Sequence, residues 1–246
     1  LAPGPSPPAF GPDEYMKRLG ALPLAYQPGE RWLYHTGSDV LGVLLARAAG
    51  QSLDLLLQER VFGPLGMKDT GFFVPPAKID RLTTAYWTDF QTGKLEVYDD
   101  AKSGLWSKPP RFPAGGGGLV STVDDFLAFS RMMLNKGKLD GVRIVSRPSI
   151  ETMTSDQLTS AQKNASDMVE DYFDSHGWGF GVGVTTRRIN PAEPVGQYGW
   201  DGGLGTSWRC DPAEDMVTIL LTQRLWSSPV PPAVCVDFWT QAYAAI

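Results

Sequence analysis

Residues with the chemistry to bind a metal or form a disulfide are few and far apart in this sequence. The chain has two cysteines, Cys210 and Cys235, and two histidines, His35 and His176. A structural zinc site needs four such ligands, commonly in closely spaced pairs, and that spacing does not occur here, so we predict no metal site. A disulfide between the two cysteines stays open, but two buried free thiols are the favoured interpretation. His35 is interpreted as an exposed loop residue rather than as a catalytic base.

The glycine run at residues 115–118 is a second feature that could serve a site. Ordering four successive glycines costs much backbone entropy, so the run is interpreted as a flexible hinge or as a close approach of another backbone. Directly after it, Ser121 or Thr122 can cap a helix over residues 125–134, whose apolar stripe is interpreted as helix core.

The elements that precede this run are mainly helical. Residues 1–12 are rich in proline and predict an extended linker, and Asp13 can then cap a short helix. An apolar helix is predicted over residues 40–49, with Gly50 just beyond its C-terminal end. A further helix is predicted over residues 52–61.

The last part of the chain has strand-length apolar stretches separated by short turns, which predict an antiparallel meander followed by a C-terminal helix. We therefore predict an α+β fold. Its parts are a mostly helical subdomain with long loops (13–175) and a region of antiparallel strands plus the C-terminal helix (176–246). The predicted strands cover residues 178–186, 195–200, 205–210 and 216–222, and the helix covers 232–245.

One C-terminal helix can cover only part of a sheet with large apolar residues on both faces. The sheet is therefore expected to receive further strands or helices from elsewhere. The net charge of −5 disfavours nucleic acid or an anionic membrane as the main partner, because both attract basic surfaces. The sequence also lacks a run of about 18 apolar residues, so no membrane span is predicted.

Four segments, in the same order along the chain, resemble the penicillin-recognising serine hydrolases, that is, the class C β-lactamases and their esterase relatives. The resemblance extends over about residues 12–225. Within the family, the chain is similar to the C-terminal portion of the protein. The matching segments are Pro28 to Gly42, Pro64 to Thr70, Gly115 to Asp125 and Tyr198 to Trp208.

The resemblance implies a β-lactamase/transpeptidase-like fold, in which a helical subdomain lies beside an antiparallel sheet and the active site lies in the cleft between them. It also implies three catalytic elements: a Ser-x-x-Lys nucleophile, a tyrosine loop, and a strand of the Lys-Thr-Gly or Trp-x-Gly type. The serine attacks an acyl carbonyl and water releases the acyl-enzyme, which requires no cofactor.

Two catalytic residues are implied by the match. Tyr34 corresponds to the tyrosine of the second element and would carry the serine proton to the leaving group. A phenol has a pKa of about 10 and needs a nearby cation for this task at neutral pH. Gly203 corresponds to the residue whose amide helps to bind the oxyanion.

Substrate-binding positions are implied at Thr36 and at Trp200, Asp201 and Gly202, which correspond to an edge strand beside the acyl group. Thr36 stands where the family commonly has asparagine, and Trp200 where β-lactamases have lysine. Because those two residues hold β-lactam substrates, the replacements favour a carboxylic ester as substrate, with weak β-lactam hydrolysis as a secondary activity. Asp201 is expected to repel substrate carboxylates.

The nucleophile is the largest departure from the family pattern. No Ser-x-x-Lys lies before Tyr34, and the one such pattern, Ser160 to Lys163, falls in a polar, loop-like stretch that is expected to be mobile. The N-terminal strands and the nucleophile helix are therefore expected to lie outside this chain, in a missing N-terminal segment or a second chain. The alternatives are a non-catalytic relative that binds ligands in the cleft, a penicillin-binding or D-amino-acid peptidase-type protein, and an enzyme that uses Ser160.

Overall fold

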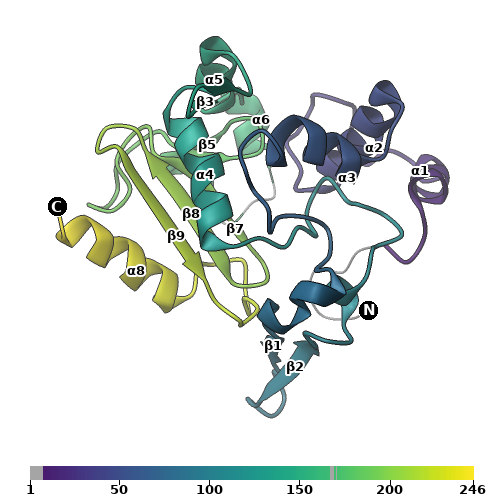
Figure 1. Ribbon diagram of the computed structural model, residues 1–246. Coiled ribbons are helices and arrows are strands. Elements are labelled where there is room, and N and C mark those ends of the chain that lie inside the picture. Colours follow the sequence, from purple (N-terminus) through teal and green to yellow (C-terminus); the bar gives the residue numbers. More distant parts are fainter. Residues whose placement is uncertain (1–7, 167–168, 170) are drawn as a thin grey trace.

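The computed structural model describes residues 8–166, 169 and 171–246. In this part of the chain the N-terminal helices lie beside an antiparallel sheet formed by the C-terminal third (Figure 1). The predicted α+β class is confirmed. The stretch predicted as a linker lies mostly outside the described residues, and its last residue, Pro12, already belongs to the first helix.

Local sequence signals set the ends of the N-terminal helices. Helix α1 (Pro12–Gly20) begins at Pro12 with Gly11 as its N-cap, because the fixed φ of proline suits the first helical position, so the prediction that Asp13 caps the helix is wrong. Helix α2 (Thr36–Ala49) ends, as predicted, at a left-handed Gly50 with φ of 66°. It begins before the predicted start and includes Thr36. Next come α3 (Leu53–Leu57), the π-helix η1 (Gln58–Phe62) and the 3-10 helix η2 (Pro76–Arg81).

The middle of the chain combines a hairpin with short helices. Helix α4 (Val123–Leu134) is capped by the Thr122 side chain, which accepts a hydrogen bond of 3.2 Å from the amide of Asp125, as the sequence predicted. The other elements are β1 (Ala85–Thr88), β2 (Leu95–Asp99), η3 (Leu105–Ser107), β3 (Lys138–Leu139), β4 (Val142–Arg143), α5 (Arg147–Met153), α6 (Ser160–Asn164) and α7 (Tyr172–Ser175).

The main sheet has the order β5-β6-β7-β8-β9, with every neighbouring pair antiparallel, so the predicted meander is confirmed. The stretch predicted as one strand over 178–186 is divided by a turn in which Gly181 has a φ of 85°. The strands are β5 (His176–Trp178), β6 (Gly183–Thr185), β7 (Tyr198–Gly202), β8 (Thr206–Asp211) and β9 (Met216–Leu221), and helix α8 (Ala233–Ala244) follows them.

Strand β7 is paired on both sides along only part of its length. Strand β6 pairs with it at Tyr198 and Gly199, whereas β8 pairs with it from Tyr198 to Gly202. The segment from Trp200 to Gly202 therefore extends past β6 and has one open side, as an edge strand does.

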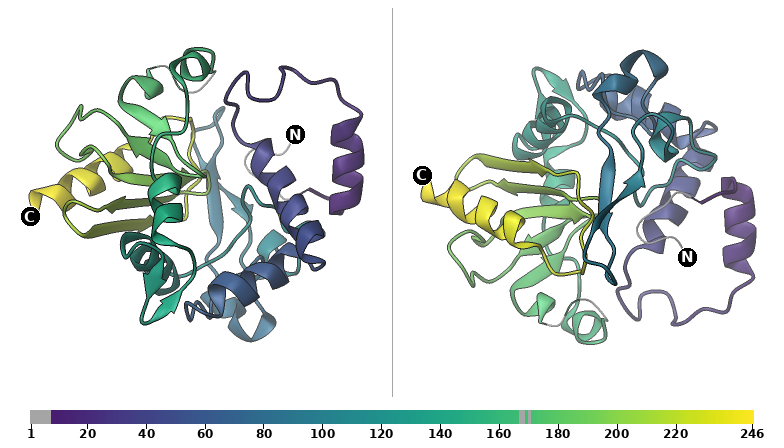
Figure 2. Two further views of the ribbon diagram at one scale, coloured as in Figure 1. Left: turned by 90° about the horizontal axis from the view of Figure 1, so that it is seen from above. Right: turned by 90° about the horizontal axis from the view of Figure 1, so that it is seen from below.

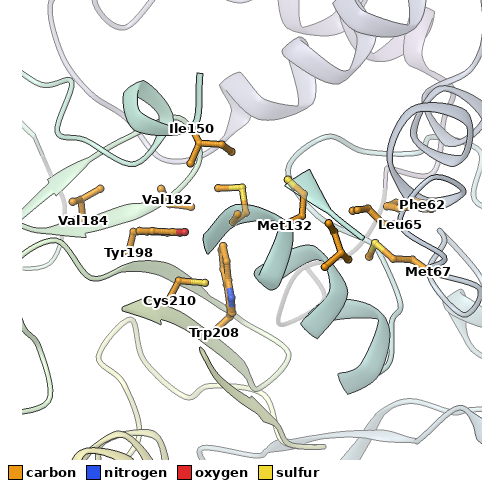
Figure 3. Packing of buried hydrophobic residues seen from close by; sticks show 12 residues of the cluster. Phe62, Leu65, Met67, Met132, Ile150, Val182, Val184, Tyr198, Trp208 and Cys210 are labelled. Carbon is orange, nitrogen blue, oxygen red and sulfur yellow. The ribbon is translucent and has the colours of Figure 1, made fainter. Parts of the chain in front are cut away.

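The principal core lies between the sheet and α4. Met132 and Met133 of α4 pack against Tyr198, Trp208 and Cys210 of the sheet (Figure 3). This core takes side chains from both sides of the predicted boundary at residue 175. The opposite face of the sheet packs on α8 through a smaller cluster of the buried residues Ala192, Cys235 and Trp239.

The glycine run brings two backbones together rather than forming a hinge. A side chain at Gly115 would collide with the carbonyl oxygen of Ser38, so only glycine fits there. The amide of Gly116 donates a hydrogen bond of 2.8 Å to Asp39. The run thus holds the first turn of α2, and with it the loop that carries Tyr34.

Both cysteines are buried free thiols, which confirms the favoured interpretation of the sequence. Burial raises the pKa of the Cys210 thiol to about 12, so that this thiol stays protonated at neutral pH.

Among the described residues, no single helix has the length and apolar character needed to cross a bilayer. Helix α2 and the α3–η1 segment pass that test only when taken together as a bent pair, by length and composition alone.

Candidate functional site

A hydrogen bond joins Tyr34 to Trp200. The indole Nε1 of Trp200 donates to the Tyr34 phenol oxygen over 2.8 Å, between residues 166 positions apart in the sequence. Tyr34 lies in the loop just before α2, and Trp200 lies on the open-sided part of β7. Two of the segments that resemble the family, far apart in the sequence, are therefore in contact in the fold.

Further aromatic rings hold this pair in place. Trp178 of β5 packs edge-on against Trp200 with ring centroids 4.5 Å apart, and Trp32 lies 4.7 Å from Trp178. Tyr34 contacts both Trp178 and Trp200, at 6.1 and 5.6 Å. Such contacts fix ring orientation, so the phenol of Tyr34 has a defined position although about half of the residue (51%) is exposed.

The direction of the Trp200–Tyr34 hydrogen bond determines whether the Tyr34 hydroxyl can still donate its own hydrogen. Because the indole can only donate, it occupies a lone pair of the Tyr34 oxygen and leaves the phenol hydrogen free to reach another acceptor. Tyr34 is therefore arranged to exchange a proton with a group entering the cleft.

The Asp201 carboxylate forms an ion pair with a residue of the neighbouring strand β8. This carboxylate binds the Arg209 guanidinium in a bidentate ion pair, with N–O distances of 2.9 and 2.7 Å. The side chains of Asp201 and Arg209 are only 10% and 17% exposed, and the guanidinium also lies over the Trp239 ring at 4.5 Å. Arg209 thus offsets the negative charge of Asp201, on which the predicted repulsion of substrate carboxylates depends.

Gly202 is the last residue of β7, and Gly203 is the first residue of the turn that follows it. A Cβ at Gly202 would collide with the Thr206 hydroxyl, so a larger residue there would require the Thr206 side chain to move. The carbonyl of Gly203 accepts a hydrogen bond of 3.0 Å from the amide of Trp226, which fixes the orientation of the turn. Among the described residues, the Gly203 amide has no acceptor.

A cleft of about 810 Å³ contains most of the predicted site residues, and its size is in the range of small-molecule sites. Tyr34, Trp200, Asp201 and Gly203 line it. Thr36 and Gly202 are not among its described lining residues. Thr36 is exposed at the first position of α2.

Several other residues that line the cleft carry no recognisable signal in the sequence. Trp87 and Phe90 come from the β1–β2 hairpin, and Trp226 follows β9. His176 also lines it. Burial lowers the pKa of this histidine, which favours the neutral ring at pH 7, and its Nδ1 lies 2.9 Å from the Ser175 hydroxyl.

The Ser160 pattern is built into an ordered helix. The Thr159 side chain and Gln162 form a capping box at the start of α6, and Gln162 donates a hydrogen bond of 2.8 Å to the carbonyl of Gly29. The ammonium of Lys163 pairs with the Asp156 carboxylate, and the Lys163 side chain is 17% exposed. The lysine is thus engaged in an ion pair, and the stretch that was predicted to be loop-like contains the helix α6.

Within the described ranges, His, Cys, Asp and Glu side chains form no group suited to a metal ion.

The sequence model of the Beta-lactamase family matches residues 1–232. The chain belongs to this family. Its relatives include Protein Rv1367c of Mycobacterium tuberculosis, which is 36% identical over 96% of this chain and 57% of the relative. Esterase EstB of Burkholderia gladioli is 28% identical over 91% of the chain and 57% of its own length. The chain thus spans a little over half the length of these relatives.

Solved structures of other proteins have the same fold as this chain. EstCE1, described as a hydrolase with promiscuous acyltransferase activity, superposes with a TM-score of 0.78 at 22% identity, over 98% of this chain and 63% of EstCE1. A penicillin-binding protein homologue from Pyrococcus abyssi gives 0.71 at 21% identity, over 97% of this chain and 48% of the homologue. The predicted β-lactamase/transpeptidase-like fold is confirmed, and the chain belongs to a serine hydrolase family with esterase and peptidase members.

Proposed function

We propose that this chain holds the proton-transferring tyrosine and the carbonyl-binding strand of a serine esterase, and that the nucleophilic serine comes from a segment outside its 246 residues. The main support is the 2.8 Å hydrogen bond from Trp200 to Tyr34, because it unites the two motif elements on the wall of one cleft.

The roles follow from the groups that face the cleft. Tyr34 acts in its phenolate form, which the lysine ammonium that accompanies the serine in the outside segment would stabilise. The phenolate accepts the proton of the serine hydroxyl as the serine oxygen attacks the ester carbonyl, and Tyr34 passes this proton to the departing alkoxide. The Gly203 amide donates to the oxyanion that forms on the carbonyl oxygen. A water molecule then attacks the acyl-enzyme by the same route, which releases the carboxylic acid and restores the serine.

An ester without a carboxylate suits this cleft better than a β-lactam does. Among the described residues that line it, Arg209 is the one arginine or lysine, and Asp201 already binds its guanidinium. A substrate carboxylate would therefore enter without a free cationic partner. Relatives named Esterase EstB and Lovastatin esterase, at 28% and 27% identity, agree with this choice.

The substrate class can be tested on the extended protein, defined as this chain together with the residues encoded before Leu1. We expect kcat/KM for 4-nitrophenyl acetate to exceed that for a chromogenic cephalosporin by about tenfold or more. The reason is that the described lining of the cleft offers no free cationic side chain to bind the cephalosporin carboxylate. Initial rates followed by absorbance give both values. A cephalosporin turned over as well as the ester would contradict the esterase assignment.

A further inference from the structure

The β1–β2 hairpin carries two aromatic side chains to the rim of the cleft. The hairpin lies at the lower edge of the molecule in Figure 1, and in the views from above and below it falls between the sheet and the N-terminal helices (Figure 2). Trp87 of β1 and Phe90 of the connecting turn both line the cleft, and Phe90 is 70% exposed. A large apolar side chain with this exposure at a cleft wall is a candidate contact for an apolar ligand group.

The turn that carries Phe90 is ordered by its own hydrogen bonds. Asp89 accepts from the amide of Gln91 and from the hydroxyl of Thr92, both at 2.8 Å, and its own amide donates to the carbonyl of Lys94 at 2.9 Å. These hydrogen bonds close the turn, so Phe90 is carried by a turn of defined conformation.

The hairpin is also tied to the candidate oxyanion site. The amide of Tyr86 donates to Gln223 at 2.7 Å, and the amide of Leu225 donates to Tyr86 at 2.8 Å. The next residue, Trp226, donates from its amide to the carbonyl of Gly203 at 3.0 Å. The hairpin is therefore tied to Gly203 by backbone hydrogen bonds to two successive residues, Leu225 and Trp226.

From this arrangement we propose that the β1–β2 hairpin is the specificity element of the site, with Phe90 and Trp87 receiving the apolar acyl group of the substrate. The inference rests on the proposed function and adds the substrate class: esters of carboxylic acids with an acyl group larger than acetyl. The acyl half is favoured because the hairpin is bonded through Trp226 to the turn that would hold the acyl carbonyl.

Binding to this chain tests the proposal without any need for a nucleophile. We use the anilides 4-nitrohexananilide and 4-nitroacetanilide, which share the nitrophenyl group and differ only in the acyl chain. Titration followed by tryptophan fluorescence gives both dissociation constants. We expect the hexanoyl compound to bind about tenfold more tightly, and Phe90→Ala to remove most of this preference, because truncation deletes the apolar contact.

Leu95→Ala is the matched control, since Leu95 is a 53% exposed apolar residue of the same hairpin that is not among the cleft-lining residues. It should keep the hexanoyl preference. Equal binding of the two anilides, or a preference unchanged in Phe90→Ala and also in Trp87→Ala, would overturn the specificity role. The proposed function is tested separately by ester hydrolysis in the extended protein. Hydrolysis without acyl preference would refute the hairpin's role alone, and preference without hydrolysis would refute the esterase alone.

Discussion

Replacing Tyr34 by phenylalanine in the extended protein should lower kcat for 4-nitrophenyl acetate by about 10²–10⁴-fold, the usual contribution of a positioned general acid–base. The substitution removes the oxygen that exchanges the proton, which is also the acceptor of the Trp200 indole hydrogen bond. The ring contacts with Trp178 and Trp200 are retained, so the wall of the cleft should keep its shape. Steady-state rates, with circular dichroism to confirm the fold, measure the effect.

Tyr26→Phe provides the control for Tyr34→Phe. Tyr26 lies in the same N-terminal region, where its ring packs under the Arg31 guanidinium at 4.0 Å, and it is not among the residues that line the cleft. Its hydroxyl has no part in the proposed chemistry, so this variant should keep the wild-type rate. A Tyr34→Phe protein that also keeps its rate would remove Tyr34 from the mechanism.

Replacing Arg209 by alanine should lower the free energy of unfolding by about 3–5 kcal/mol, because it leaves the Asp201 carboxylate without its partner in a nearly buried position. The same change removes the guanidinium from the Trp239 ring. Since Asp201 follows Trp200 directly, loss of the pair should also loosen the strand that holds the indole. Urea denaturation at neutral pH measures the stability change.

Two further variants show whether burial is the cause. Arg18→Ala breaks an ion pair of similar length, 2.7 Å to Glu14, but its side chains are 61% and 43% exposed, so the loss should stay below about 1 kcal/mol. The double variant Asp201→Asn with Arg209→Met removes both charges and should recover much of the stability. If Arg209→Ala cost no more than Arg18→Ala, the pair would have no structural importance.

The elements that the sequence predicted correctly depend on local signals. Gly50 ends α2 because only a residue tolerant of positive φ fits there, and Thr122 caps α4 with its own hydroxyl. The strands follow from runs of apolar residues between turn residues. Each of these signals lies within a few residues of the structure that it determines, so a single sequence is sufficient to read it.

The features that the sequence did not reveal depend on register and on long-range contacts. The pairing of Asp201 with Arg209 requires knowledge of how β7 aligns with β8, and composition does not specify that alignment. Likewise, Phe90 reaches the cleft only because β1 bonds to residues after β9. The meeting of Tyr34 with Trp200 was predicted through the family resemblance and not through any local pattern.

The most direct test of the central claim is intact mass spectrometry after treatment with a fluorophosphonate that labels active serines. We expect no adduct on this chain and one adduct on the extended protein, located on a serine before Leu1, because the described site offers Tyr34 and Gly203 but no serine activated by a free lysine. An adduct on Ser160 of this chain, or an unlabelled extended protein, would contradict the account.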